Sequence, residues 1–268
     1  MTLESTDGVG IGIEGGVLHI RLDRPERKNA LNLDAVARIV DALEQASLDD
    51  ALRAVLLRSS GADFCAGSDW VASNTAGGPR PRTGSVQRRT PLQAHRIIQL
   101  LVEIQLPVVC VVRGWAAGLG CQLALAADFT VASTTSRFWE PFLQRGFSPD
   151  SGATWLLPRL VGVARAKELL LLGRELSGTE AAEWGLIHRA VPDGDLEATA
   201  DELVTRLASA PTVALGLTKR CIHRALEGSL VEAMEAESNA LELSSRTGDF
   251  KEGLSAFRES RPPRFEGR

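Results

Sequence analysis

The stretch that decides the fold reads PVVCVVRGWAAGLGCQLALAAD, residues 107–128. It opens with an apolar, mostly β-branched run at 108–112, the length expected for a strand buried on both faces. A glycine-rich turn at 113–120 and a strongly helical run at 121–127 follow directly. Because the first N–H groups of a helix are unpaired and lie at the positive end of its dipole, this turn favours a group that carries or develops negative charge.

Bulk composition excludes several classes of protein. The chain has 268 residues, 44% of them hydrophobic and 24% charged, which is ordinary for a soluble globular protein. A net charge of −4 argues against a nucleic-acid or membrane partner, and no apolar run is long enough to span a bilayer. The N-terminus lacks the pattern of a signal peptide, and four scattered cysteines form no CxxC pair. We therefore expect a reduced, cytoplasmic protein without disulfides or zinc.

Outward from residues 107–128, apolar runs typical of strands alternate with helical stripes. Runs at 54–57 and 129–132 predict buried strands, and residues 36–43 place an apolar stripe on one helix. This alternation predicts parallel βα crossovers, with a β/α body over 1–190 and a helical C-terminal region over 191–268.

Local signals predict where three C-terminal helices begin. Ser177 with Glu180 and Ser229 with Glu232 are spaced as capping boxes, and Asp249 is expected to cap the last helix.

One glycine motif is misleading. Gly10, Gly12 and Gly15 satisfy the GxGxxG pattern of dinucleotide-binding enzymes. That fingerprint requires a strand before it and a helix after it, and this region instead predicts a hairpin. A Rossmann dehydrogenase is therefore disfavoured.

A second glycine turn, FCAGSDW over residues 64–70, follows the predicted strand at 54–57. A surface loop rich in Gly, Pro, Ser and Arg is expected after it, over residues 73–90. With both turns considered, the chain resembles the crotonase superfamily, the enoyl-CoA hydratase/isomerase family. The matching motifs are Arg24-Pro25, Asn29-Ala30-Leu31, the turns at 64–69 and 114–120, Pro149-Asp150-Ser151-Gly152-Ala153-Thr154, Trp184-Gly185-Leu186 and the tail from Lys251 to Phe265.

The resemblance implies an α/β fold, a crotonase-like spiral of ββα repeats with a helical C-terminal trimerisation region. It also implies a homotrimer or dimer of trimers, an acyl-CoA thioester as substrate, and no cofactor beyond the coenzyme A of the substrate. An oxyanion hole would be formed by the backbone N–H groups of Ala66 and Leu119. Two fixed donors there would stabilise the negative charge that forms on a thioester oxygen when a proton is removed beside it.

The chain departs from the family's hydratases at their two catalytic glutamates, which would fall at Gln122 and Phe142. An ordinary hydratase mechanism is therefore disfavoured. Asp150 stands where the epoxyphenylacetyl-CoA isomerases and 4-chlorobenzoyl-CoA dehalogenases of the family carry an aspartate. We expect an enoyl-CoA isomerase in which Asp150 moves the proton, although Asp150 also suits a helix N-cap. Glu140 is a second catalytic candidate, or a solvated glutamate.

Further residues are expected to bind the substrate. His95 is expected to assist as an acid or orient the acyl group, or to be structural, and aromatic side chains could wall the acyl group. Asp69 is expected to fix the oxyanion turn. Basic side chains are expected to bind the pyrophosphate of CoA, and Phe257 is expected to contact the adenine end of CoA. The complete set is Arg24, Lys28, Ala30, Phe64, Ser68, Asp69, Trp70, His95, Gly118, Trp139, Phe142 and Phe257.

Other functions remain open at this point. They are a hydratase with an atypical water-positioning group, a dehalogenase or hydrolase that uses Asp150 as a nucleophile, and a non-catalytic acyl-CoA-binding protein.

Overall fold

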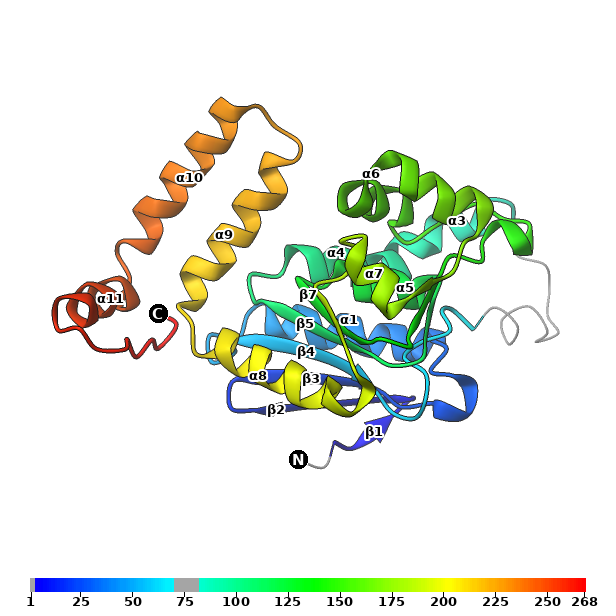
Figure 1. Cartoon of the computed structure of the whole chain (residues 1–268), viewed down its shortest axis with the longest axis horizontal. Helices are drawn as coiled ribbons and strands as arrows, with labels where there is room; N and C mark the ends of the chain where they lie inside the picture. Colours follow the sequence, from blue (N-terminus) through cyan, green and yellow to red (C-terminus); the bar gives the residue numbers. More distant parts are fainter. Residues whose placement is uncertain (1–2, 70–81) are drawn as a thin grey trace.

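A computed structural model of the chain describes residues 3–69 and 82–268, and within these its main element is a sheet of seven strands (Figure 1). The strands lie in the order β1-β2-β3-β4-β5-β7-β10. The pairs β1–β2 and β2–β3 are antiparallel, and from β3 onward every pair is parallel. Their bounds are β1 Ser5–Thr6, β2 Val9–Glu14, β3 Val17–Leu22, β4 Ala54–Ser59, β5 Val108–Val112, β7 Phe129–Ser133 and β10 Arg189–Val191.

A small second sheet joins three short strands around the site described below. It has the order β6-β8-β9, with bounds β6 Trp115–Ala117, β8 Arg137–Trp139 and β9 Leu176–Ser177.

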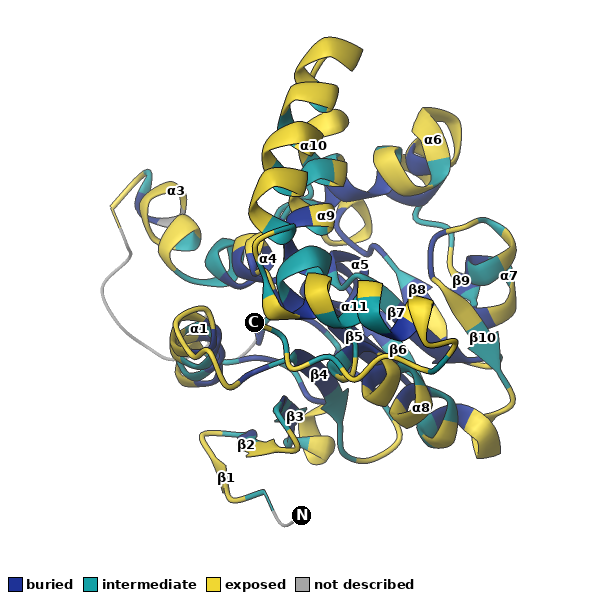
Figure 2. Ribbon diagram, turned by 90° about the vertical axis from the view of Figure 1, so that its left-hand side faces the viewer, coloured by how far each residue is buried: buried dark blue, intermediate teal, exposed yellow. Residues whose placement is uncertain are grey.

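Strand β5 is buried on both faces, as its apolar run predicts. Val108, Cys110 and Val112 join the core beneath α1, α4 and α5, while Val109 and Val111 join a second core beneath α8. Successive side chains of a strand point to opposite faces, so one strand contributes to both cores. Figure 2 shows the central strands as mainly buried.

Helices cover both faces of the sheet and continue beyond it. Their bounds are α1 Leu33–Ala46, α3 Ser85–Arg89, α4 Ala94–Glu103, α5 Leu119–Ala126, α6 Ala153–Leu172, α7 Gly178–Glu183, α8 Leu196–Ala208, α9 Thr212–Ala225, α10 Leu230–Ser244 and α11 Gly248–Arg258. Short 3-10 helices lie at Pro25–Arg27, Thr90–Leu92, Leu143–Arg145 and Asp193–Asp195. No helix in the described part of the chain is long and apolar enough to cross a bilayer.

Helix α8 belongs by its packing to the body, which corrects the predicted division at 190/191. Leu196, Ala200, Val204 and Leu207 lie buried against the sheet in the second core. The projecting part of the chain is therefore α9 to α11, which extends away from the sheet in Figure 1.

The misleading glycine motif lies in the antiparallel pair β2–β3, where Gly15 and Gly16 turn the chain. No helix follows it, and the predicted hairpin is confirmed. Part of the loop expected over 73–90 forms α3, while residues 73–81 lie outside the described residues.

Candidate active site

The two glycine turns lie against each other. Cys65 N–H donates to Trp115 O at 2.8 Å, and Ala117 N–H donates to Cys65 O at 2.9 Å. The approach is close enough that a Cβ built on Gly67 would lie 3.5 Å from Leu119 N and 2.8 Å from Ala117 O. Segments about 50 residues apart in sequence are thus held side by side by backbone hydrogen bonds.

The amide assigned to the first turn needs correction. Ala66 N–H donates to Lys28 O at 2.9 Å, so it is not available to a ligand. Among the described residues, none accepts a hydrogen bond from Ser68 N–H, two residues further along. Leu119 N–H is likewise unpaired within the described residues, because it opens α5. The pair of open amides is therefore Ser68 and Leu119.

Each open amide directly follows a glycine with positive φ. Gly67 has φ 95° and precedes Ser68, and Gly118 has φ 52° and precedes Leu119. Residues with a side chain rarely adopt such values. Gly120 is required for a different reason, since a Cβ there would lie 2.2 Å from Cys65 O. The glycines therefore permit the backbone conformation before each open amide and let the two turns approach.

Asp150 lies between β8 and the start of α6. Burial raises the pKa of its carboxyl, while the nearby Ser151 hydroxyl and His95 partly offset that rise. The N-cap position of α6 is Gly152, and no side chain caps that helix. Helix capping, the alternative role for Asp150, is thus not what its side chain does.

Glu140 is a second carboxyl of the site, and it is 2% exposed. Its Oε1 accepts a hydrogen bond from Gln122 Nε2 at 2.6 Å. Burial raises the pKa of Glu140 to about 8; Gln122 and Cys121 oppose this rise, and the charge of Asp150 adds to it. The solvated alternative for Glu140 is wrong, and at neutral pH its carboxyl is largely protonated.

His95, on α4, contacts the loop that carries Asp150. Its Nε2 accepts a hydrogen bond from Ser151 N–H at 3.2 Å. Ser151 has φ 51°, an uncommon value for a residue with a side chain, and this bond helps to hold it there. His95 therefore positions the Asp150 loop.

The basic residues expected at the pyrophosphate differ in their engagement. Arg24 donates to Ala30 O at 2.8 Å and pairs with Asp69 at 3.5 Å, and Arg27 also pairs with Asp69. Lys28 is mostly exposed and lies 3.5 Å from Asp63. Asp69 thus ties the first glycine turn to the segment that holds Arg24, and Lys28 is the more accessible cation.

The aromatic candidates do not form one wall. Trp139 donates its indole N–H to Gly173 O and packs against Trp115, whereas Phe142 is buried edge-on to Phe147. Phe64 is fully buried in the core.

Two aromatic candidates lie apart from these. Phe257 is 86% exposed on α11, well separated from α5 and α6 in Figure 1. Trp70 lies outside the described residues.

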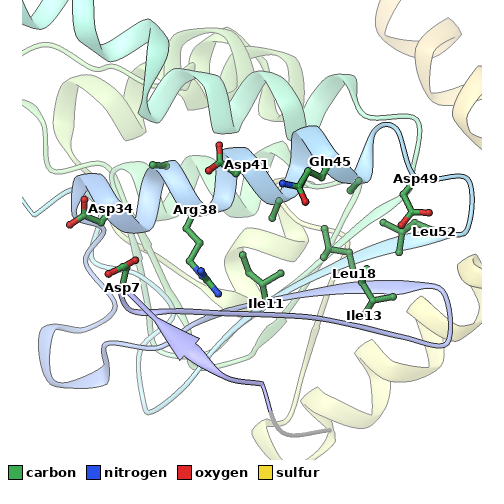
Figure 3. Close-up of a pocket in the computed structure, with 13 residues that line it drawn as sticks. Asp7, Ile11, Ile13, Leu18, Asp34, Arg38, Asp41, Gln45, Asp49 and Leu52 are labelled. Carbon is green, nitrogen blue, oxygen red and sulfur yellow. The ribbon is translucent and has the colours of Figure 1, made fainter.

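A groove of about 570 Å³ lies elsewhere, between α1 and the β2–β3 hairpin (Figure 3). Aspartates at 7, 34, 41 and 49 line it around an apolar floor, and Arg38 donates to Val9 O across it. None of the candidate catalytic residues reaches this groove. Its acidic rim would repel the phosphates of CoA.

Sequence reasoning missed the roles of three polar residues. Ser68 was expected only as a substrate contact, while Gln122 and Ser151 were not expected as site residues. A signal for Ser68 was present, because it follows a glycine just as Leu119 does.

Comparison with known proteins agrees with this geometry. Residues 12–268 match the family described as enoyl-CoA hydratase/isomerase. The chain belongs to this family, within the crotonase superfamily, and has its fold.

Particular relatives align over almost the entire chain. The 1,2-epoxyphenylacetyl-CoA isomerase of Escherichia coli K12 is 41% identical, over 96% of this chain and 97% of its own. A probable enoyl-CoA hydratase of Rhodobacter capsulatus is 38% identical, over 96% of both chains. The crystal structure of an enoyl-CoA hydratase from Bacillus anthracis superposes with a TM-score of 0.90 at 30% identity, covering 97% of this chain and 100% of that one.

Proposed function

We propose that this chain is an acyl-CoA isomerase that moves a double bond by proton transfer. Asp150 removes a proton from C2 or C4 of the acyl group, and the Ser68 and Leu119 amides hold the resulting enolate oxygen. Asp150 then returns the proton at the other carbon. Asp150 takes one proton from the substrate and returns one to it, so the proposed reaction needs no metal or redox cofactor.

The observation that carries this proposal is the setting of Asp150. Its carboxyl has a raised pKa, caps no helix, and sits on a loop that His95 holds. A carboxylate of raised pKa is a better base than one in water. The relative named as a 1,2-epoxyphenylacetyl-CoA isomerase adds support.

Hydration, the reaction named for other relatives, finds less support in the site. The positions expected to hold the two water-binding glutamates carry Gln122 and Phe142, and Phe142 is buried against Phe147. Glu140 is the remaining carboxyl that could activate water. With a pKa of about 8 it is mostly protonated at pH 7 and is a poor base.

We also propose where coenzyme A lies and how chains assemble. Lys28, exposed beside the first turn, would meet the pyrophosphate. Helices α9 to α11, which carry exposed apolar side chains, would mediate a homotrimer or dimer of trimers.

The test is turnover of a 3-enoyl-CoA to the conjugated 2-enoyl-CoA, followed by ultraviolet absorbance. Asp150→Asn should lower kcat by about 1000-fold or more with little change in the Kd of a saturated acyl-CoA. The matched control is Asp41→Asn, in the acidic groove, which should behave as wild type. Unchanged turnover in Asp150→Asn would remove Asp150 from the mechanism.

Two further measurements test the alternative reactions. Water addition to crotonyl-CoA as the faster reaction would favour the hydratase. A covalent adduct on Asp150, seen by mass spectrometry, would favour the nucleophilic alternative.

A further inference from the structure

The outer edge of strand β2 is unpaired over most of its length. The inner side of β2 pairs with β3 at every residue from Val9 to Glu14, whereas β1 pairs on the outer side only with Val9 and Gly10. Alternate residues of an antiparallel strand direct their N–H and C=O groups to opposite sides. Within the described residues, 11–14 therefore leave backbone donors and acceptors unpaired at the edge of the sheet.

Leu3, the first described residue, does not cover this edge. A Cβ built on Gly10 would lie 3.1 Å from Leu3 Cβ, so Leu3 lies on the face of the sheet toward which Gly10 points. Leu3 O also accepts a hydrogen bond from Arg21, which pairs with Gly10 and shares that face. Successive residues of a strand point to opposite faces, so Leu3 lies on the face opposite Ile11.

An apolar groove runs beside the open edge, on the face that α1 covers. It is the groove of Figure 3, and Ile11 and Ile13 of β2 line it together with Leu18 of β3. Leu18 is buried, whereas Ile13 is 57% exposed. Small side chains of α1 form the other wall and leave the groove wide, namely Ala37, Ala42 and Ala46. Solvent-exposed apolar surface thus lies next to unpaired backbone groups.

The rim of the groove is acidic, and its carboxylates have no cation to pair with among the described residues. Four exposed aspartates line it, and none of them makes an ion pair within the described part of the chain: Asp7, Asp34, Asp41 and Asp49. Arg38 is the one cation among the described lining residues, and it donates to Val9 O. Figure 3 shows Asp7 and Asp34 at one end of the groove and Asp49 at the other.

Each feature selects one property of a ligand. An open strand edge pairs with an extended backbone, the apolar floor accepts apolar side chains, and the acidic ends attract basic ones. We propose that the outer edge of β2 is a docking site for an extended segment of a partner protein. On the side that faces the groove, this segment carries apolar residues flanked by basic ones. It adds a strand to the sheet and is independent of the proposed reaction.

The probe is a synthetic peptide, Lys-Thr-Val-Thr-Val-Thr-Lys, blocked at both ends and titrated into the full chain by calorimetry. In an extended peptide its lysines and valines share one side. It should bind about 10-fold or more tightly than the peptide with glutamate in place of lysine. It should exceed its fully N-methylated form by a similar factor, because that form has no N–H to donate. Equal binding by either comparison peptide, or no binding of the probe at about 1 mM, would overturn the proposal.

Variants assign the binding to this groove. Asp34→Asn/Asp41→Asn should weaken binding of the probe about 10-fold, and the loss should be smaller at high salt. Ile13→Thr keeps a β-branched side chain at an exposed position but makes it polar, and should weaken binding about threefold or more. Unchanged affinity in both variants would place the peptide elsewhere and overturn the assignment.

The matched control is Glu235→Gln/Glu237→Gln, which removes two exposed charges on α10. It should change the Kd of the probe by less than about twofold. An equal loss in this control would attribute the effect to overall charge and overturn the proposal.

A second copy of the chain is the other extended partner that could occupy the edge. In that case Asp34→Asn/Asp41→Asn would change the mass measured by light scattering, and this result would overturn a separate partner. Asp150→Asn should bind the probe as the wild type does. Failure of isomerisation with intact peptide binding would therefore overturn only the proposed reaction, and isomerisation without peptide binding would overturn only this inference.

Discussion

Asp150 and Glu140 are both carboxyls whose pKa is raised by burial, yet their partners differ. Asp150 lies beside Ser151 and His95, which favour its charged form. Glu140 is deeper, bonds to Gln122 and feels the charge of Asp150. Two neighbouring carboxyls whose partners differ in this way can divide the roles of base and neutral acid between them.

This division of roles predicts a bell-shaped dependence of kcat/KM on pH. Activity should rise as Asp150 loses its proton, at a pH above the ordinary range of an aspartate. It should fall near pH 8, where Glu140 ionises and adds negative charge beside the developing enolate. Glu140→Gln, measured over the same range, should lose the falling limb. A falling limb that persists in this variant would assign it to another group.

Glu140 should also make the stability of the fold depend on pH. Its pKa is about 8 in the folded chain against an ordinary 4.5, so the folded state holds this proton more tightly. The contribution of Glu140 to the free energy of unfolding therefore decreases as pH rises from about 4.5 to 8, by a few kcal/mol in all. Urea unfolding at pH 5 and pH 9 should show a smaller loss for Glu140→Gln than for wild type. Equal losses would contradict the buried, protonated state of Glu140.

Residue roles were predictable where a side chain has one plausible function. Leu119 N–H is open at the start of α5 and the Asp150 carboxyl has a raised pKa, and their catalytic roles stay predictions. Ala66 was wrong because its N–H already binds Lys28 O, a contact with a segment far from it in the sequence. The bond between Gln122 and Glu140 depends on how α5 packs against the segment after β8, which no local pattern encodes.

At the scale of elements, the site depends on the two positive-φ glycines that precede the open amides. Gly67→Ala would place a Cβ 2.8 Å from Ala117 O at a φ of 95°. We expect a loss of about 1–3 kcal/mol in stability and a larger loss in kcat than in binding, since the Ser68 amide would be displaced. Gly194→Ala is the control, because a Cβ added there would meet no atom within 4 Å. Unaltered kcat in Gly67→Ala would contradict the role of Ser68.

Elements with strong local signals were predictable. The capping boxes at Ser177 and Ser229 are confirmed, with each serine side chain accepting from the third helical N–H. The cap expected from Asp249 was wrong. Thr247 caps α11, and the Asp249 carboxylate instead accepts from Glu266 N and Gly267 N of the tail. Capping by sequence spacing fails where a tertiary partner competes for the same carboxylate.

At the scale of the whole molecule, the projecting helices present an apolar surface. Leu230, Val231, Met234 and Leu241 of α10 are each more than half exposed, and Figure 2 shows most of α10 as exposed. An apolar pocket of about 470 Å³ lies between α9 and α6. Exposed apolar surface of this kind is typical of an interface.

We therefore predict that light scattering will give three or six times the 28.7 kDa mass of one chain. Met234 and Leu241 lie seven residues apart on one face of α10, so changing both to Glu should shift the mass toward that of a single chain. A wild-type protein that is monomeric at micromolar concentration would contradict this assembly.

The large-scale arrangement was only partly predictable. The parallel sheet followed from the apolar runs, because both faces of β5 had to be buried. The placement of α8 did not, since its apolar face reads equally well as part of a helical appendage or as a cover for the sheet.

The most direct measurement of the central claim is exchange of the C2 proton of a saturated acyl-CoA in D2O, followed by NMR. Wild-type protein should exchange this proton, because Asp150 removes it while the Ser68 and Leu119 amides hold the enolate, and Asp150→Asn should not. No exchange by the wild type, or equal exchange by the variant, would contradict the account.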